Sequence, residues 1–121
     1  MSEEIKKIIQ DIGGKADEWI KVSERPGKSP FAKELNYSFG DYFWGKVHVR
    51  NEGEIYVLVI SKDVFNWKER IKDLQLKGEI IDAAGGLMWI QENNSEGLKS
   101  DFEFIKNFVE SIRKQKQQKT S

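Results

Sequence analysis

Residues 37–60 read YSFGDYFWGKVHVRNEGEIYVLVI and hold six of the fourteen aromatic residues and the only histidine of the chain. From residue 42 onward the side chains alternate in character, which predicts a β-strand over 42–50 because successive side chains in a strand point to opposite faces. Phe43, Val47 and Val49 form an apolar set, which predicts a core face. The alternate set combines rings with cationic or titratable groups and is named here the aromatic-basic face: Tyr42, Trp44, Lys46, His48 and Arg50.

The length of the loop after this strand decides which residues of the next strand join the core face and which join the aromatic-basic face. A two-residue turn at 52–53 would need a positive φ at Glu52, whereas a three-residue loop over 51–53 needs it only at Gly53, where no Cβ opposes it. The three-residue loop is therefore predicted, and it pairs Arg50 with Glu54, His48 with Tyr56 and Val47 with Val57. The core face then gains Ile55, Val57 and Val59, and the aromatic-basic face gains Tyr56, Leu58 and Ile60. Apolar side chains such as Leu58 and Ile60 predict that a ligand, a neighbouring subunit, or both cover this face.

The composition indicates one globular domain over residues 1–121, with 38% hydrophobic and 33% charged residues and a mean hydropathy of -0.64. No apolar run approaches the roughly 20 residues of a membrane span, and residues 1–7 show no signal-peptide pattern, so a cytoplasmic protein is predicted. The absence of cysteine excludes disulfides, thiol chemistry and cysteine-ligated zinc. The bias toward Lys, Glu and Ile is typical of thermophiles.

Charge is balanced overall, with 20 basic and 20 acidic residues, which argues against a protein that coats duplex DNA through bulk charge. The distribution is uneven, however. Residues 106–121 carry four more positive than negative charges, whereas residues 92–103 carry three more negative than positive charges.

The first part of the chain predicts a helix and then a loop. Apolar residues at spacings of three and four predict an amphipathic helix over 3–21 with Ser2 as its N-cap, and Gly13-Gly14 predicts a bend or break within it. Both prolines fall in 23–36, which is predicted to be a loop. Gly40-Asp41 predicts a tight two-residue turn, with the glycine first, that joins a short strand near 35–39 to strand 42–50; a single bent and bulged strand is the alternative.

The second part predicts a helix, a hairpin and a long helix. Asp63 is predicted to cap a helix over 64–76 that Gly78 ends. Strands 79–84 and 87–92 are predicted to turn at Gly85-Gly86, with Trp89 sharing a face with Ile80. Ser100 and Glu103 match a capping box, so the last helix is predicted to start there and to run to about residue 115, followed by a frayed tail over 114–121. The predicted class is α+β: an antiparallel sheet of about four strands backed by helices, with a long C-terminal helix.

No motif predicts catalysis or a cofactor. His48 is the only histidine and there is no cysteine, so no metal site is predicted. A serine triad would have to use His48 but lacks a nucleophile elbow, and the glycine pairs match no phosphate-binding loop. A nuclease-type carboxylate cluster has only scattered candidates: Asp41, Glu54, Asp82 and Glu92.

Rings beside cations are what a single-stranded nucleic acid needs, because bases stack on the rings and phosphates meet the charges. The predicted nucleic-acid site is Tyr42, Trp44, Lys46, His48, Arg50, Tyr56 and Trp89. The predicted oligomer interface is Leu58, Ile60, Phe104 and Phe108, of which the two phenylalanines widen the apolar stripe of the last helix. A protein or oligomer interface on the same face remains open as an alternative.

The aromatic run YSFGDYFWGKVHVR at 37–50, its flanking helices and the long last helix resemble the ThermoDBP-related archaeal single-stranded DNA-binding proteins. The resemblance implies a sheet backed by helices, dimers or tetramers, and single-stranded DNA held between subunits with little sequence preference and no enzymatic activity. The expected function is thus non-enzymatic binding of single-stranded DNA or RNA by a homo-oligomer. A small adaptor or chaperone-like dimer that binds protein through its sheet face and last helix is the alternative.

Overall fold

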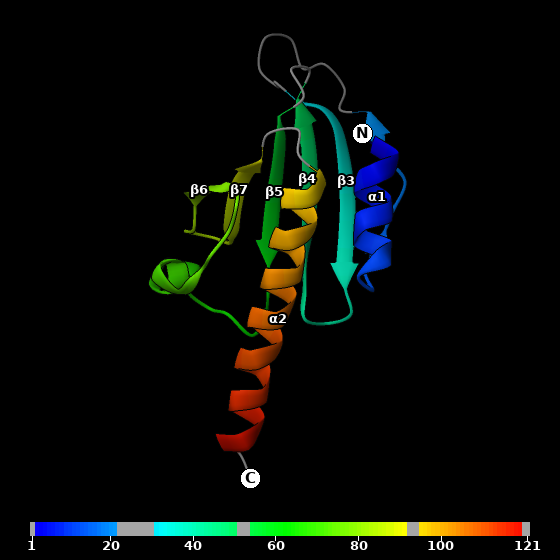
Figure 1. The fold of residues 1–121 in the computed structure, drawn as a ribbon. Coiled ribbons are helices and arrows are strands. Elements are labelled where there is room, and N and C mark those ends of the chain that lie inside the picture. The colour runs from blue at the N-terminus through cyan, green and yellow to red at the C-terminus, as the bar shows by residue number, and fades with distance from the viewer. Residues whose placement is uncertain (1, 22–30, 51–53, 92–94, 120–121) are drawn as a thin grey trace.

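The computed structural model describes residues 2–21, 31–50, 54–91 and 95–119. An antiparallel sheet crosses the molecule and helices lie against one of its faces (Figure 1). The elements in chain order are α1 (Ser2–Asp11), β1 (Lys15–Ala16), β2 (Ile20–Lys21), β3 (Phe31–Phe39), β4 (Phe43–Arg50), β5 (Ile55–Ile60), the 3₁₀ helix η1 (Trp67–Asp73), β6 (Glu79–Asp82), β7 (Leu87–Gln91) and α2 (Ser95–Lys119). The mixed α and β class with a C-terminal helix is confirmed, but the sheet has seven strands instead of about four.

The sheet runs in the order β1-β3-β4-β5-β7-β6, and β2 also pairs with β3. The predicted register between β4 and β5 is confirmed, because His48 lies opposite Tyr56 and Val47 lies opposite Val57. The Arg50 amide also donates to the Glu54 carbonyl at 2.9 Å. The loop 51–53 that was predicted to set this register lies outside the described residues.

The turn between β3 and β4 confirms a hairpin and excludes the bulged single strand. Phe39 pairs with Phe43, Gly40 has a φ of 52°, and the Tyr42 amide donates to the Phe39 carbonyl at 3.0 Å. The predicted two-residue turn is wrong, because Tyr42 also belongs to the turn and β4 begins one residue later than predicted. The predicted loop over 23–36 is wrong for residues 31–36, which form the first part of β3; residues 23–30 lie outside the described chain.

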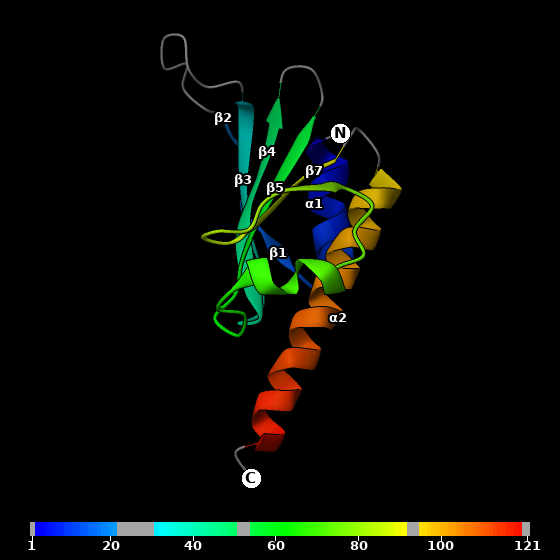
Figure 2. The same ribbon diagram turned by 90° about the vertical axis from the view of Figure 1, so that its left-hand side faces the viewer.

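The core lies between the sheet and the two helices, which cover the same face of the sheet (Figure 2). Alternate residues of the central strands point into it, among them Leu35, Phe43 and Val57, all fully buried. The helices contribute apolar stripes: Ile5, Ile8 and Ile9 from α1, and Leu98, Phe102, Ile105, Val109 and Ile112 from α2. The apolar stripe predicted for the last helix is thus confirmed as core.

The predicted helix over 3–21 ends at Asp11, so the break predicted near Gly13-Gly14 is a full end. Gly13 has a φ of 97°, and the Gly14 amide donates to the Ile9 carbonyl at 2.8 Å. After this turn, residues 15–16 and 20–21 pair with β3 as short strands. Gly14 is required there because a Cβ would lie 2.7 Å from the Ile9 side chain.

The helix predicted over 64–76 is also shorter and of another kind. Only Trp67–Asp73 is helical, in a 3₁₀ conformation, and its N-cap is Asn66 instead of Asp63. The Asn66 side chain accepts a hydrogen bond from the Lys68 amide at 3.1 Å. Val64 and Trp67 are buried and Leu74 packs against the core, but Ile71 is 39% exposed, so the predicted apolar stripe is interrupted there.

The capping box predicted at Ser100 and Glu103 is wrong, because α2 begins at Ser95 and both residues lie inside it. Leu98 is fully buried, so the extra helical turn adds core contact, and such packing outweighs a local capping signal. The helix also continues to Lys119, past the predicted end near residue 115 and into the predicted frayed tail.

Candidate nucleic-acid interface

The aromatic-basic face lies on the side of the sheet opposite α1 and α2 (Figure 2). The strand register arranges its side chains in three cross-strand rows. They are Ser38, Trp44 and Ile60 in the first row, Asn36, Lys46, Leu58 and Met88 in the second, and Glu34, His48, Tyr56 and Ile90 in the third. Rings, cations and aliphatic groups therefore share one surface, as the alternation of β4 predicts.

Trp44 is the accessible ring of this face. It is 38% exposed, and its cross-strand neighbour Ile60 is 36% exposed. Phe43, the preceding residue, is fully buried on the other side of the strand. A half-exposed indole on a rigid central strand can stack on a planar ligand without a change of the backbone.

Glu34 places a carboxylate among the cations of the face. Its Oε1 lies 2.8 Å from His48 Nε2 and 3.4 Å from Lys46 Nζ. The hydrogen bond with His48, followed by the charge of Lys46, holds the pKa of Glu34 below its usual value despite partial burial. The sequence-based site missed Glu34 because residues 23–36 were predicted to be a loop, although E-L-N-Y-S-F alternates like the strand it is.

The Arg50 end of the face forms a closed cluster. Arg50 Nη1 donates to Tyr56 Oη at 2.9 Å and to Glu54 Oε2 at 3.3 Å, and the Tyr56 hydroxyl donates to Glu54 Oε2 at 3.1 Å. The guanidinium carbon also lies 5.4 Å from the centre of the Tyr56 ring. One side of that ring is therefore covered, so Tyr56 is less accessible for stacking than Trp44.

Two predicted site residues do not lie on this face. Tyr42 sits in the turn before β4, and its ring packs under the Arg113 guanidinium of α2, 4.9 Å from ring centre to carbon. Trp89 is fully buried on the core side, where its ring lies 5.9 Å from that of Phe102. Its Nε1 donates to Gln91 Oε1 at 3.2 Å, which satisfies the indole inside the core. Trp44, Lys46, His48, Arg50 and Tyr56 remain together as predicted.

The predicted oligomer-interface residues fall on two surfaces. Leu58 and Ile60 belong to the aromatic-basic face. Phe104 and Phe108 lie on α2, with ring centres 6.3 Å apart, and line a shallow groove between α2 and η1 together with Arg70 and Asp73. Phe108 also packs against the buried Trp67, at 6.2 Å between ring centres. A single flat interface cannot include both pairs.

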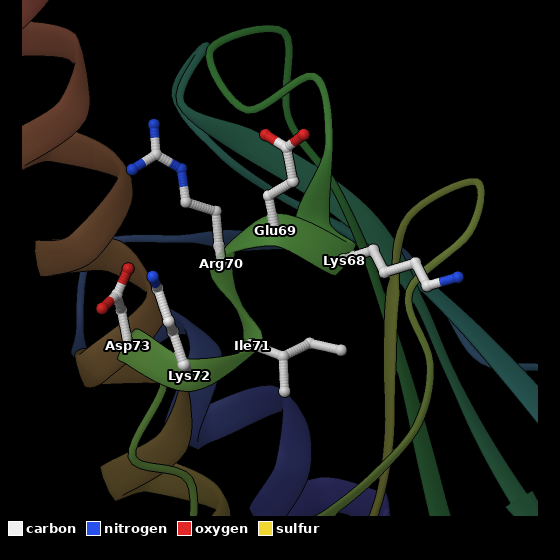
Figure 3. A pocket seen from close by; sticks show the side chains of 6 residues that line it. All are labelled: Lys68, Glu69, Arg70, Ile71, Lys72 and Asp73. Carbon is white, nitrogen blue, oxygen red and sulfur yellow. The ribbon is translucent and has the colours of Figure 1, made fainter.

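A second hollow lies beside η1 and is lined by successive residues of that helix. Figure 3 shows that their side chains point in different directions, with Lys68 and Arg70 on opposite sides. Such divergence gives no set of groups that could act on one substrate atom. Within the described part of the chain, no three His, Asp or Glu side chains are placed to hold a metal ion.

No helix among the described residues is long and apolar enough to cross a membrane. No protein-family model, curated protein or solved structure matches the chain. The resemblance to the ThermoDBP-related proteins therefore stays a prediction, and function has to be argued from the geometry of the face.

Proposed function

We propose that the protein is a non-enzymatic, cytoplasmic binder of single-stranded DNA that uses the aromatic-basic face with little sequence preference. The observation that carries the proposal is Trp44, 38% exposed in the first row of the aromatic-basic face, with Lys46 in the next row. Stacking of unpaired bases on sheet rings is a recurrent mode of single-strand recognition.

The charges of the face support binding that depends more on stacking than on phosphate contacts. Lys46 and His48 share Glu34, and Arg50 is paired with Glu54. A phosphate must compete with these carboxylates for each cation. The balanced net charge of the whole chain agrees with this picture. We therefore expect a weak salt dependence, with few counterions released on binding.

A titration of fluorescently labelled oligo-dT, followed by anisotropy at two salt concentrations, tests the proposal. Single strands should bind more tightly than a duplex of equal length, and log K should fall with log salt with a slope of about -1 to -2, as for two or three phosphate contacts. Equal or tighter binding of the duplex, or no binding at low salt, contradicts the proposal. Tighter binding of oligo-rU than of oligo-dT would make RNA the ligand.

We also propose that the protein is a homo-oligomer, a dimer or tetramer. Ile60 is 36% exposed beside Leu58, and the groove at Phe104 and Phe108 offers a second apolar surface. Sedimentation velocity at micromolar concentration should show a species larger than the 14.1 kDa chain. Ile60→Glu and Phe104→Glu, measured side by side, identify which surface assembles. A parent protein that sediments only as a monomer contradicts the assembly.

A second function is favoured by the same carboxylates and by the aliphatic content of the face. Glu34 and Glu54 already neutralise its cations, and Ile60, Leu58, Met88 and Ile90 place aliphatic groups in all three of its rows. That composition fits a small adaptor or chaperone-like dimer that binds extended protein segments. A protein that suppresses aggregation of an unfolded test protein but leaves oligo-dT anisotropy unchanged would support this function over the first.

A further inference from the structure

We infer that a bound single strand leaves the aromatic-basic face at its Trp44 end, places one base in a cleft beside Ile60, and continues along the basic C-terminal half of α2. The inference rests on the proposed function and adds the direction in which the strand runs. It assigns binding roles to the cleft and to Lys114 and Lys116, which the sequence-based site does not include.

The two ends of the face differ in what they leave accessible. At the Arg50 end, the guanidinium covers one side of the Tyr56 ring and is held by Glu54. At the other end, Trp44, Ile60 and Phe65 are exposed by 38%, 36% and 88%. Exposed apolar side chains therefore gather where β4 begins and β5 ends, and Trp44 is the ring among them with no cation against it in the described contacts.

A cleft of about 200 Å³ opens beside Ile60, the cross-strand neighbour of Trp44. Its walls are Ile60, Ser61, Val64, Phe65, Trp67 and the turn residues Ala84, Gly85 and Gly86. Figure 2 shows that the turn between β6 and β7 projects on the side of the sheet away from the helices. The cleft is smaller than the roughly 300–1,000 Å³ of pockets for drug-sized ligands, so it fits one planar ring system. Because Ile60 lies opposite Trp44, a base in the cleft would neighbour a base stacked on the indole.

The C-terminal half of α2 supplies positive charge at this same end. Residues 107–119 contain Arg113, Lys114, Lys116 and Lys119 against Glu110 as the single acid. This half of the helix projects past the end of the sheet, below the strands (Figure 2). An apolar cleft with aromatic walls beside a cationic helix is complementary to a polyanion that carries bases. A single-stranded nucleic acid is therefore the occupant that fits both features.

Several contacts fasten α2 to the Trp44 end. Asp41 accepts hydrogen bonds from both Arg113 and Lys62, with Arg113 Nη2 at 2.8 Å and Lys62 Nζ at 3.2 Å. Lys116 Nζ donates to the Asp63 carbonyl at 2.6 Å and lies 4.5 Å from the centre of the Phe65 ring. Lys116 thus joins a wall of the cleft to the basic helix, and the two parts of the path form one surface.

Charge removal on α2 tests the path with a matched control. The variant Lys114→Gln/Lys116→Gln is compared with Lys72→Gln/Lys99→Gln, which removes equal charge from exposed positions on η1 and on the N-terminal half of α2. Each is titrated with oligo-dT of about 4 and about 12 nucleotides, near the ends of the range of site sizes for single-strand binders. For the longer oligonucleotide, the first variant should reduce the salt slope by about 1.4, as for two lost phosphate contacts, while the control should not change it.

A second variant tests the cleft itself. A Cβ on Gly85 would meet no atom within 4 Å, so Gly85→Leu can enter the cleft space without a clash at the backbone. It should weaken binding of the longer oligonucleotide by about fivefold or more, the effect of one lost base stack. Thermal melts of all variants confirm that each is folded.

The outcomes separate the path from the proposed function. Two results overturn the path and leave the proposed function standing when Trp44→Ala weakens binding. In one, the Lys114→Gln/Lys116→Gln variant keeps the salt slope of the parent; in the other, it lowers that slope no more than the control variant does. If the parent binds no oligonucleotide at low salt, the proposed function fails and the path fails with it. If Gly85→Leu converts an oligomer to a monomer, the cleft holds a second copy of the chain and the path is overturned.

Discussion

The two faces of the sheet use the same strands in opposite ways. On β4, Phe43 and Val47 are fully buried, whereas Trp44 between them is 38% exposed. Each face also has one partly or wholly buried carboxylate with polar partners: Asp101 of α2 meets the Lys77 and Gly78 amides, and Glu34 of β3 meets His48 and Lys46. A carboxylate with polar partners therefore occurs on both sides of the sheet, and access to water separates structural roles from binding roles.

The two carboxylates show this difference in their proton affinity. Burial raises the pKa of Asp101 above its usual value, although the two backbone amides act in the opposite direction. The pKa of Glu34 is lowered, chiefly by its hydrogen bond with His48. The Asp101 carboxylate of α2 is thus held by backbone amides in a buried site. The Glu34 carboxylate on the aromatic-basic face is held by the side chains of His48 and Lys46.

The largest expected effect is that of Phe43→Ala. Removal of a fully buried ring should cost about 3–5 kcal/mol of folding free energy, which threatens a domain of ordinary stability. Urea denaturation measures the loss. Trp44→Ala is the control from the other face and should change stability by less than about 1 kcal/mol. If Trp44→Ala proves much more destabilising than Phe43→Ala, the two faces of the strand have been exchanged.

Asp101→Ala should have the next largest effect. Asp101 Oδ1 accepts from the Lys77 amide at 2.7 Å and Oδ2 from the Gly78 amide at 2.9 Å, and the residue is 1% exposed. Its loss leaves two amide donors without that acceptor, at a cost of about 2–4 kcal/mol. Asp101→Asn keeps one carbonyl oxygen and should lose less. Equal stability of Asp101→Ala and the parent would show that water replaces the carboxylate.

The pH dependence of Asp101 has a defined sign. The pKa of Asp101 is higher in the folded protein than its value of 3.8 in the unfolded chain. The stability gained from its protonated form is therefore complete below pH 3.8 and is lost as pH rises through the folded-state pKa. The stability gap between the parent and Asp101→Asn should therefore be wider at pH 3 than at pH 7. Melts across this range check the direction.

Trp44→Ala should affect binding instead of folding. Loss of one base platform should cost about 1–3 kcal/mol of binding free energy, with the urea midpoint close to that of the parent. Anisotropy titrations with oligo-dT measure the first quantity. Trp44→Phe keeps a smaller ring and should retain part of the affinity. Unchanged affinity of Trp44→Ala would remove the observation on which the proposed function depends.

Glu34→Gln should have the smallest effect on stability, about 0–1 kcal/mol, because its ion pairs are partly exposed to solvent. The pKa of Glu34 is lower in the folded protein than its value of 4.5 in the unfolded chain. The stabilisation by its ionised form is therefore complete above pH 4.5 and is lost as pH falls through the folded-state pKa. The gap between the parent and Glu34→Gln should close in acid, opposite in sign to that of Asp101→Asn. A gap that widens in acid would contradict the ion pairs with His48 and Lys46.

The strand patterns of the centre of the sheet could be predicted because they are local. Alternation along β4 separates Phe43 from Trp44, and the predicted register with β5 is the observed one, so five of the predicted site residues lie together. The prediction that Tyr42 belongs to the aromatic-basic face was wrong, because the turn extends one residue into the alternating run. Glu34 was missed because the prolines before β3 outweighed a clear alternation in the prediction.

The sequence by itself determined the alternation of β4 and β5 and the apolar stripe of α2, since these depend on the two-residue period of strands and on the helical period. Only the tertiary structure decided that Trp89 is core, that α2 starts at Ser95 instead of at the capping box, and that Arg113 of α2 meets Asp41 in the turn between β3 and β4. The reason is physical: burial and the meeting of distant segments depend on which surfaces pack together, and no local period contains that information.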